Sequence, residues 1–293
     1  MQAINRIKIP STIAAYFVAA SFLFTSPPVR AETSLERGAY LMNSIVACGN
    51  CHTPQTPAGP APGMELAGTY LIEEKGVFTA FAPNITPDPE TGIGGWSEMD
   101  LKKAIRDGIR PDGSVIGPPM PIGLYKGISD QDLDAIVAYV RSVPPVKNQV
   151  QRSLYQIPLP PNYGPPAANV QAPSSDDTLA YGAYLAGPLG HCIECHPPFT
   201  DGHPDYANRL GAGGVEFIGP WGKSVSANIT PHADGLKAKT DDYLASVITT
   251  GKRPDGSTLK PPMGFSYYRN LRQQDLAAII GYLRSLPPLP SLR

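Results

Sequence analysis

The residues of this chain best suited to chemistry are its cysteines. There are only four, in two pairs of identical spacing, and a histidine follows each pair directly: Cys48-Gly-Asn-Cys51-His52 and Cys192-Ile-Glu-Cys195-His196. C-x-x-C-H is the attachment signal for c-type haem. Two thiols at this spacing can add across the two vinyl groups on one side of a porphyrin, and the following imidazole can then bind the iron. We therefore predict two covalently attached haem c groups.

Other uses of cysteine fit this pattern less well. Two disulfides would suit an exported protein with four cysteines, but they would not require a histidine after each pair. A structural zinc site needs four ligands, and the first motif has no further Cys or His before His191. The second motif has His191 and His203 nearby, so zinc is conceivable only there. A dithiol redox motif usually lies in an α/β pattern, which is not evident in this sequence.

The two motifs belong to a tandem repeat. Arg37-Gly-Ala-Tyr-Leu41 matches Tyr181-Gly-Ala-Tyr-Leu185 at the same offset as the cysteines, and the Asn-Ile-Thr-Pro, Arg-Pro-Asp-Gly-Ser and Pro-Pro-Met motifs also occur twice. A proline-rich segment, with eight prolines in residues 144–173, separates the two copies. Such a segment is extended and fairly stiff. We divide the chain into a signal peptide at 1–31, a first domain at 32–146, a linker at 147–175 and a second domain at 176–293.

The elements that must position the motifs are predicted to be helices. With 34 prolines and 29 glycines, long uninterrupted elements are not expected, because proline breaks both helix and sheet ladders. Apolar residues at helical spacing and Ser or Thr caps predict three helices in each half: about 34–47, 97–107 and 130–142, then 177–190, 240–250 and 273–286. Gly38 and Gly182 match inside the first helices, which indicates close approach of another helix. The predicted fold class is all-α with long loops.

Two methionines are the candidate sixth ligands of the irons. Met120 and Met263 occupy matching positions in the repeat, and each follows two prolines that stiffen its loop. A thioether favours Fe(II), so His/Met ligation raises the reduction potential. The predicted iron ligands are therefore His52 with Met120 and His196 with Met263. A buried methionine that fills a core gap is the alternative interpretation, and a histidine in place of Met263 is another.

These motifs resemble those of a known family. Each half, over nearly all of 33–145 and 177–288, resembles a class I cytochrome c domain. The repeated motifs are similar to those of the cytochrome c subunits of bacterial membrane-bound alcohol, gluconate, aldehyde and nicotinate dehydrogenases. The larger of those subunits carry three haems, whereas this chain has two C-x-x-C-H motifs. The resemblance implies two tandem class I domains joined by a Pro-rich connector.

The N-terminus and the charge restrict location and partners. Arg6 and Lys8 precede a mostly apolar stretch of residues 11–24, and cleavage after Ala31 fits an exported protein. This stretch is shorter than the roughly 20 residues that span a bilayer, so an uncleaved anchor is the less favoured interpretation. We expect a periplasmic protein, associated with the membrane only through a partner or an uncleaved signal. A net charge of -1 without basic runs argues against nucleic-acid binding.

The predicted function is electron transfer without catalysis. The chain would relay electrons from a periplasmic or membrane-bound dehydrogenase to the respiratory chain. Its acceptor would be a quinone-linked complex, an oxidase or a small redox protein. The alternative is a dihaem enzyme, such as a peroxidase or a sulfur-compound oxidase. That enzyme would need one iron with an exchangeable ligand, and the duplicated methionine argues against it.

Overall fold

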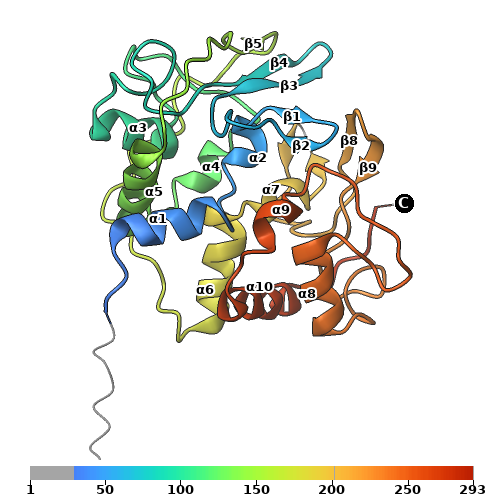
Figure 1. Ribbon diagram of the computed structural model, residues 1–293. Helices are drawn as coiled ribbons and strands as arrows, with labels where there is room; N and C mark the ends of the chain where they lie inside the picture. The colour runs from blue at the N-terminus through green and yellow to red at the C-terminus, as the bar shows by residue number, and fades with distance from the viewer. Residues whose placement is uncertain (1–29, 201, 293) are drawn as a thin grey trace, which may run out of the picture. The chain divides into compact units, whose positions relative to one another are not determined.

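The repeat forms two sets of five helices in the same order (Figure 1). The computed structural model describes residues 30–200 and 202–292, so the predicted signal peptide lies outside the described residues except for its last two. The first set is α1 (Ser34–Met42), α2 (Gly49–His52), α3 (Glu98–Asp107), α4 (Ile122–Tyr125) and α5 (Asp130–Ser142). The second set is α6 (Thr178–Tyr184), α7 (Cys192–Cys195), α8 (Asp241–Thr250), α9 (Phe265–Tyr268) and α10 (Gln273–Ser285), and the π-helix η1 (Leu185–Leu189) continues α6.

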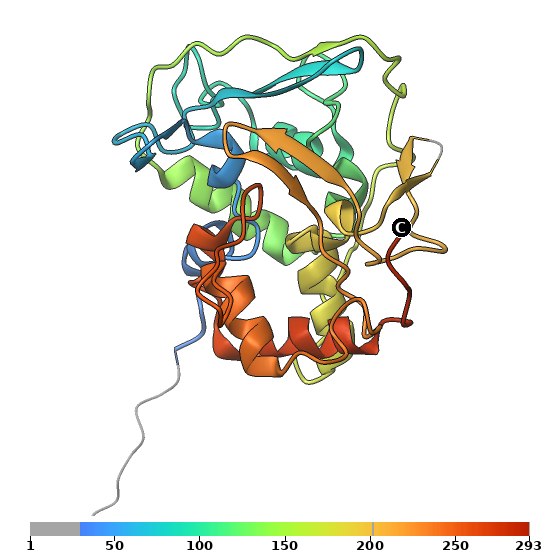
Figure 2. The same cartoon turned by 90° about the vertical axis from the view of Figure 1, so that its right-hand side faces the viewer.

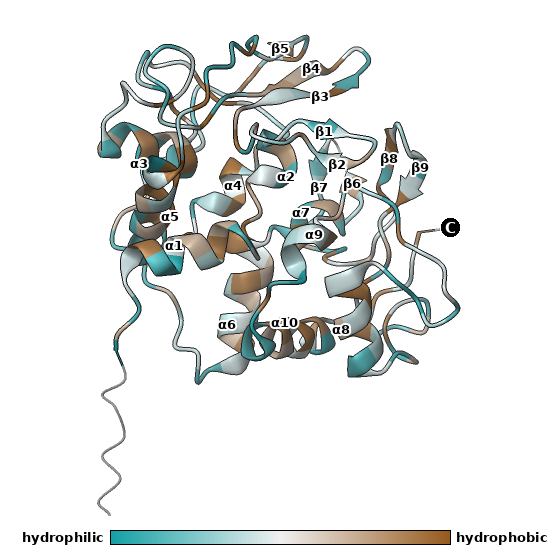
Figure 3. Ribbon diagram, in the orientation of Figure 1, coloured by the Kyte–Doolittle hydropathy of each residue, from teal (hydrophilic) through white to brown (hydrophobic). Residues whose placement is uncertain are grey.

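The first and last helices of each half cross at a glycine, as predicted. A Cβ atom on Gly38 would lie 2.0 Å from the carbonyl oxygen of Ala135, and one on Gly182 would lie 2.1 Å from that of Ala278. No side chain fits at such distances, so both crossings require glycine. The apolar faces of α5 and α10 turn inward (brown in Figure 3) and join one buried cluster with residues of both halves. The predicted cap Ser97 is confirmed, because its side chain accepts from the backbone N–H of Asp100.

The predicted all-α class is wrong. The described residues contain four small antiparallel sheets: β1 (Gln55–Thr56) with β2 (Gly59–Pro60), β3 (Thr69–Glu74) with β4 (Phe78–Ala82) and β5 (Leu154–Tyr155), β6 (Phe199–Thr200) with β7 (His203–Pro204), and β8 (Glu216–Gly219) with β9 (Gly222–Val225). The two larger hairpins form where loops were expected after each C-x-x-C-H motif. Aromatic and β-branched residues on either side of a glycine with positive φ favour such hairpins. Gly76 (φ 77°) lies in the turn between β3 and β4, and Gly222 (φ 84°) begins β9 directly after the turn.

The proline-rich connector packs against the first half. Its strand β5 pairs with β4, so Phe78 lies opposite Tyr155 and Thr79 opposite Leu154. Figure 2 shows this segment (yellow-green) running beside the β3–β4 hairpin. Further along, the Tyr163 hydroxyl donates to the carbonyl oxygen of Ile116 at 2.8 Å. The connector therefore adds a third strand to the β3–β4 sheet, and its later part packs over the first half.

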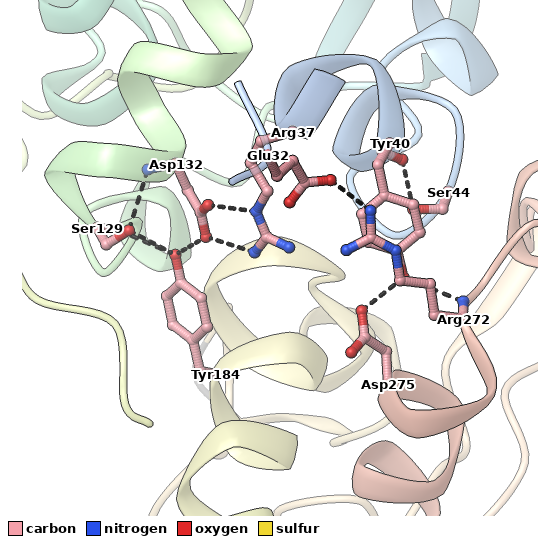
Figure 4. Close-up of polar contacts among 9 residues, drawn as sticks. All are labelled: Glu32, Arg37, Tyr40, Ser44, Ser129, Asp132, Tyr184, Arg272 and Asp275. Carbon is pink, nitrogen blue, oxygen red and sulfur yellow. Dashed lines mark hydrogen bonds and ion pairs between the residues drawn. The ribbon is translucent and has the colours of Figure 1, made fainter. Parts of the chain in front are cut away.

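The halves pack into one compact unit, and a partly buried hydrogen bond joins them on one side (Figure 4). The hydroxyl of Tyr40 on α1 donates to Oδ2 of Asp275 on α10 at 2.5 Å. The same hydroxyl accepts from the backbone N–H of Arg272 at 3.1 Å, and the Arg272 guanidinium lies 3.9 Å from the centre of the Tyr40 ring. Tyr40 thus binds the start of the last helix of the other half.

The matching residues make the reciprocal contact (Figure 4). The hydroxyl of Tyr184 on α6 donates to Oδ2 of Asp132 on α5 at 2.8 Å and accepts from the backbone N–H of Ser129 at 3.1 Å. Tyr40 and Tyr184 are equivalent in the repeat, as are Asp132 and Asp275. We call these four residues the tyrosine–aspartate latch. The two halves therefore make the same contact in both directions, as the subunits of a two-fold symmetric dimer do.

The two aspartates of the latch differ in their partners. Asp132 also binds Arg37, whose Nε lies 2.7 Å from Oδ1. The residue equivalent to Arg37 in the second half is Tyr181. Among the described residues, Tyr40 is the only side chain that donates a hydrogen bond to Asp275, which is 5% exposed.

Because of this difference, removal of the Tyr40 hydroxyl should destabilise the protein more than removal of the Tyr184 hydroxyl. Tyr40→Phe leaves a buried carboxylate without its side-chain donor, so we expect it to lower the free energy of unfolding by about 2–3 kcal/mol. Tyr184→Phe leaves the Arg37 pair in place and should cost about 1 kcal/mol. Guanidinium unfolding of the haem-loaded protein, followed by far-UV circular dichroism, measures both. Tyr70→Phe, on an exposed tyrosine, is the control and should change nothing, and equal losses from the two latch variants would contradict the assignment.

Candidate haem-attachment sites

Each C-x-x-C-H motif forms one turn of helix. In the first half Cys48 caps α2, and the backbone N–H of His52 donates to the Cys48 carbonyl oxygen at 2.9 Å. In the second half α7 begins at Cys192, and His196 follows its last residue. Cysteines three positions apart on a helix lie on the same face. Each half therefore presents two thiols to one side, as attachment to two vinyl groups requires.

The same sharp turn leads into both helices. The residue before each first cysteine has a positive φ, 48° at Ala47 and 38° at His191. Neither residue is glycine, so this left-handed backbone carries strain in both halves. None of the four cysteines forms a disulfide. Burial raises the pKa of the Cys48 thiol to about 12 and that of Cys192 to about 11, so both thiols are protonated at neutral pH.

Both motif histidines are buried and held in one orientation. Nδ1 of His52 lies 2.8 Å from the carbonyl oxygen of Pro83, and Nδ1 of His196 lies 2.6 Å from that of Ala227. A carbonyl oxygen only accepts, so Nδ1 carries the proton and Nε2 keeps its lone pair for a metal. Burial lowers the pKa of both histidines, which keeps the imidazoles neutral.

The repeated Asn-Ile-Thr motif fixes these carbonyl groups. Asn84 directly follows Pro83, and its Nδ2 donates to the carbonyl oxygen of Val146 at 2.7 Å, while its Oδ1 accepts from the backbone N–H of Thr86 at 2.9 Å. Asn228 makes the equivalent contacts with the carbonyl of Leu289, at 2.7 Å, and with Thr230, at 2.9 Å. Each asparagine thus ties the segment after the last helix to the carbonyl that orients the histidine.

The two candidate methionines lie in equivalent loops. Met120 and Met263 each follow a Pro-Pro pair with a cis peptide bond, and each is half-buried. Their carbonyl oxygens accept from Ile122 at 2.9 Å and from Phe265 at 3.0 Å, where α4 and α9 begin. Met120 also contacts the central apolar cluster. The structure therefore places both methionines at the same point of their loops, and iron ligation stays a prediction.

The chemistry of the donor set fits haem c. Each half supplies two thiols and an oriented, neutral imidazole from a single turn. In the part of the chain that the structure describes, no three His, Cys, Asp or Glu side chains gather as a site of the kind that zinc would need. His191, one of its possible ligands, instead lies 3.1 Å from Oε2 of Glu194.

The comparisons with known proteins agree with this chemistry. Residues 35–144 match the family model described as cytochrome c. A protein named "Diheme cytochrome c-type" from Cereibacter sphaeroides is 30% identical over 257 residues, which cover 83% of this chain and 82% of that protein. The chain belongs to the cytochrome c family. Proteins of this family transfer electrons through covalently bound haem c, which confirms the predicted cofactor type and the prediction of an electron-transfer protein.

Other relatives of this cytochrome are parts of dehydrogenases. It is 29% identical over 309 residues to the cytochrome c subunit of alcohol dehydrogenase (quinone) from Gluconacetobacter polyoxogenes, a match that covers 98% of this chain and 63% of that subunit. It is 31% identical over 281 residues to the cytochrome subunit of fructose dehydrogenase from Gluconobacter japonicus, which covers 89% of this chain and 54% of that subunit. The chain thus corresponds to only part of these relatives. None of the helices in residues 30–200 and 202–292 is long and apolar enough to cross a membrane.

The Asn-Ile-Thr motif yields a prediction of its own. Asn84→Ala removes the acceptor of the Thr86 N–H and the amide donor to the Val146 carbonyl. Asn228→Ala removes the equivalent bonds of the Thr230 N–H and the Leu289 carbonyl. We expect each substitution to lower the free energy of unfolding by about 2–4 kcal/mol. Asn162→Ala, at an exposed turn, is the matched control and should stay within about 0.5 kcal/mol of the wild type. Equal stability of all three variants in guanidinium unfolding would show that the motif is dispensable.

Proposed function

We propose that the chain is a dihaem c-type cytochrome that relays electrons from a dehydrogenase towards the respiratory chain. The observation that carries this proposal is the pair of equivalent C-x-x-C-H turns, each with a histidine oriented by a backbone carbonyl. Haem c supplies one-electron chemistry at its iron when it is bound. The likeness to a dihaem relative over most of both chains supports two such groups.

Each half would hold one haem through two cysteine thioethers, and a histidine and a methionine would bind its iron. The proposed set is Cys48, Cys51, His52 and Met120 in the first half, and Cys192, Cys195, His196 and Met263 in the second. The carbonyls of Pro83 and Ala227 accept from the two imidazoles, which increases the basicity of each imidazole as a ligand. Methionine as the second iron ligand would raise the reduction potential. With histidine and methionine both bound to each iron, the chain would leave no place for a small substrate to bind the metal.

The proposed electron donor is a dehydrogenase subunit. Relatives of this cytochrome carry the names of alcohol, nicotinate, fructose and gluconate dehydrogenase subunits, which supports a partner of this class. The proposed acceptor is a quinone-linked complex, an oxidase or a small redox protein, and the proposed location is the periplasm. Exchange with such partners would occur through transient and small contacts.

The ligand assignment predicts how two substitutions change the spectra. Met120→Ala should convert one haem to a high-spin form that binds carbon monoxide or cyanide, and lower its reduction potential. Met263→Ala should do the same to the other haem. Visible absorption and a redox titration measure both effects, and Met99→Ala, on an exposed methionine, is the control. If Met263→Ala leaves the spectrum unchanged, another residue is the ligand in the second half.

The haem content tests the proposal most directly. The purified protein should carry two haems per chain, and acid–acetone extraction should leave both on the polypeptide. Reduced protein should pass electrons to protein acceptors, and it should not turn over peroxide, thiosulfate or simple alcohols at enzyme-like rates. Steady turnover of any of these molecules would instead favour the dihaem enzyme.

A further inference from the structure

The connector covers a loop of the first half that leads to the candidate methionine. The Tyr155 hydroxyl donates to the carbonyl oxygen of Pro118 at 2.9 Å, and the Tyr163 hydroxyl donates to that of Ile116 at 2.8 Å. Residues 114–118 are accordingly all buried or half-buried. A partner protein could reach this loop only by displacing the connector.

The matching loop of the second half is open. Residues 257–261 correspond to 114–118 in the repeat, and four of these five residues are exposed. The hydroxyl of Ser224 on β9 donates to the carbonyl oxygen of Pro261 at 2.7 Å, so β9 lies directly beside this loop. The β8–β9 hairpin lies on the outside of the described unit (labelled in Figure 1, orange in Figure 2). We call β9 together with residues 252–261 the open face.

The open face carries positive charge that the first half lacks. Three exposed lysines of this face occupy positions at which the first half has uncharged residues. They are Lys223, Lys252 and Lys260, which match Thr79, Ile109 and Gly117. The carboxylates of Glu216, which pairs with Lys223, and of Asp255 partly offset these charges.

Backbone contacts hold the segments that carry these lysines together. Nζ of Lys260 donates to the carbonyl oxygen of Lys223 at 3.2 Å. Lys252 forms an antiparallel bridge with Thr258, two residues before Lys260. The three lysines therefore lie on neighbouring segments of one face.

The total charge of the two halves differs in the same direction. Residues 32–146 contain 8 basic and 14 acidic residues, whereas residues 176–293 contain 11 of each. The first half is therefore strongly acidic and the second half is neutral. Long-range attraction of an acidic protein would favour the second half over the first.

We propose that the open face is the docking surface for a redox partner with an acidic surface, and that the connector restricts such docking to the second half. This inference rests on the proposed function, because it requires a chain that exchanges electrons with proteins. Ile218 is 71% exposed and lies opposite Lys223 in the hairpin, so it adds an apolar contact beside the cations. Apolar contacts inside a polar rim are typical of protein interfaces. A partner bound here would touch the loop that leads to Met263.

Electron transfer to an acidic protein tests the docking surface. The probe is oxidised plastocyanin, a small copper protein with an acidic surface, mixed with the reduced haem-loaded chain in a stopped-flow instrument. We expect the rate constant to fall steeply with ionic strength. The double variant Lys223→Glu/Lys260→Glu should react at least about tenfold more slowly at low salt. Lys75→Glu/Lys237→Glu makes the same change in net charge at exposed lysines outside the open face, and this matched control should react much faster than the first double variant.

Chemical cross-linking locates the contact. A carbodiimide joins lysine and carboxylate side chains that touch, and mass spectrometry identifies the joined residues. We expect the cross-links to plastocyanin to map to Lys223, Lys252 or Lys260. Cross-links that map mainly to lysines of residues 32–146 would overturn the inference.

The possible outcomes separate this inference from the proposed function. A basic mitochondrial cytochrome c serves as a second acceptor of opposite charge. Fewer than two haems, or no electron transfer to either acceptor, would contradict the proposed function and this inference with it. Two haems with electron transfer to the basic acceptor alone would overturn the inference alone. Equal rates for the two double variants with plastocyanin would do the same.

Discussion

The arrangement of both sites depends on two glycine contacts between helices. Because Gly38 and Gly182 have no side chain, the first and last helices of each half approach to a distance that no other residue allows. That approach places the N-terminus of each last helix beside the tyrosine of the other half, where the latch forms. The same first helices lead into the C-x-x-C-H turns, so the glycine crossings determine both where the thiols lie and how the halves meet.

Much of the helical framework could be predicted from the sequence. The periodic apolar residues and the caps predict helices close to those observed, and the repeat shows which residues are equivalent. The hairpins could not be predicted in the same way, because short antiparallel strands depend on pairing between segments, which helical periodicity does not report. Their local signals are present in the residues around Gly76 and Gly222, but they are weaker than the helical pattern of the repeats.

The motif chemistry was accessible from the sequence, and the surroundings of the motifs were not. Cysteine and histidine spacing predicted the attachment turns, because that chemistry is local. The carbonyl groups that orient His52 and His196 lie 31 residues further along the chain, and no pattern near the histidines points to them. The match between Tyr40 and Tyr184 is visible in the repeat, but only the folded chain shows that each binds an aspartate of the other half.

Because the connector packs on the first half, the two copies of the repeat tolerate different substitutions at one matching position. A Cβ atom on Gly117 would lie 2.6 Å from Cζ of Tyr155 in the connector, so the first copy needs glycine there. The equivalent residue of the second copy is Lys260, whose Nζ reaches the carbonyl oxygen of Lys223 at 3.2 Å. The same position of the repeat thus requires glycine in the first half and makes a surface contact in the second half. The two copies are therefore no longer exchangeable, and their order along the chain has become part of the fold.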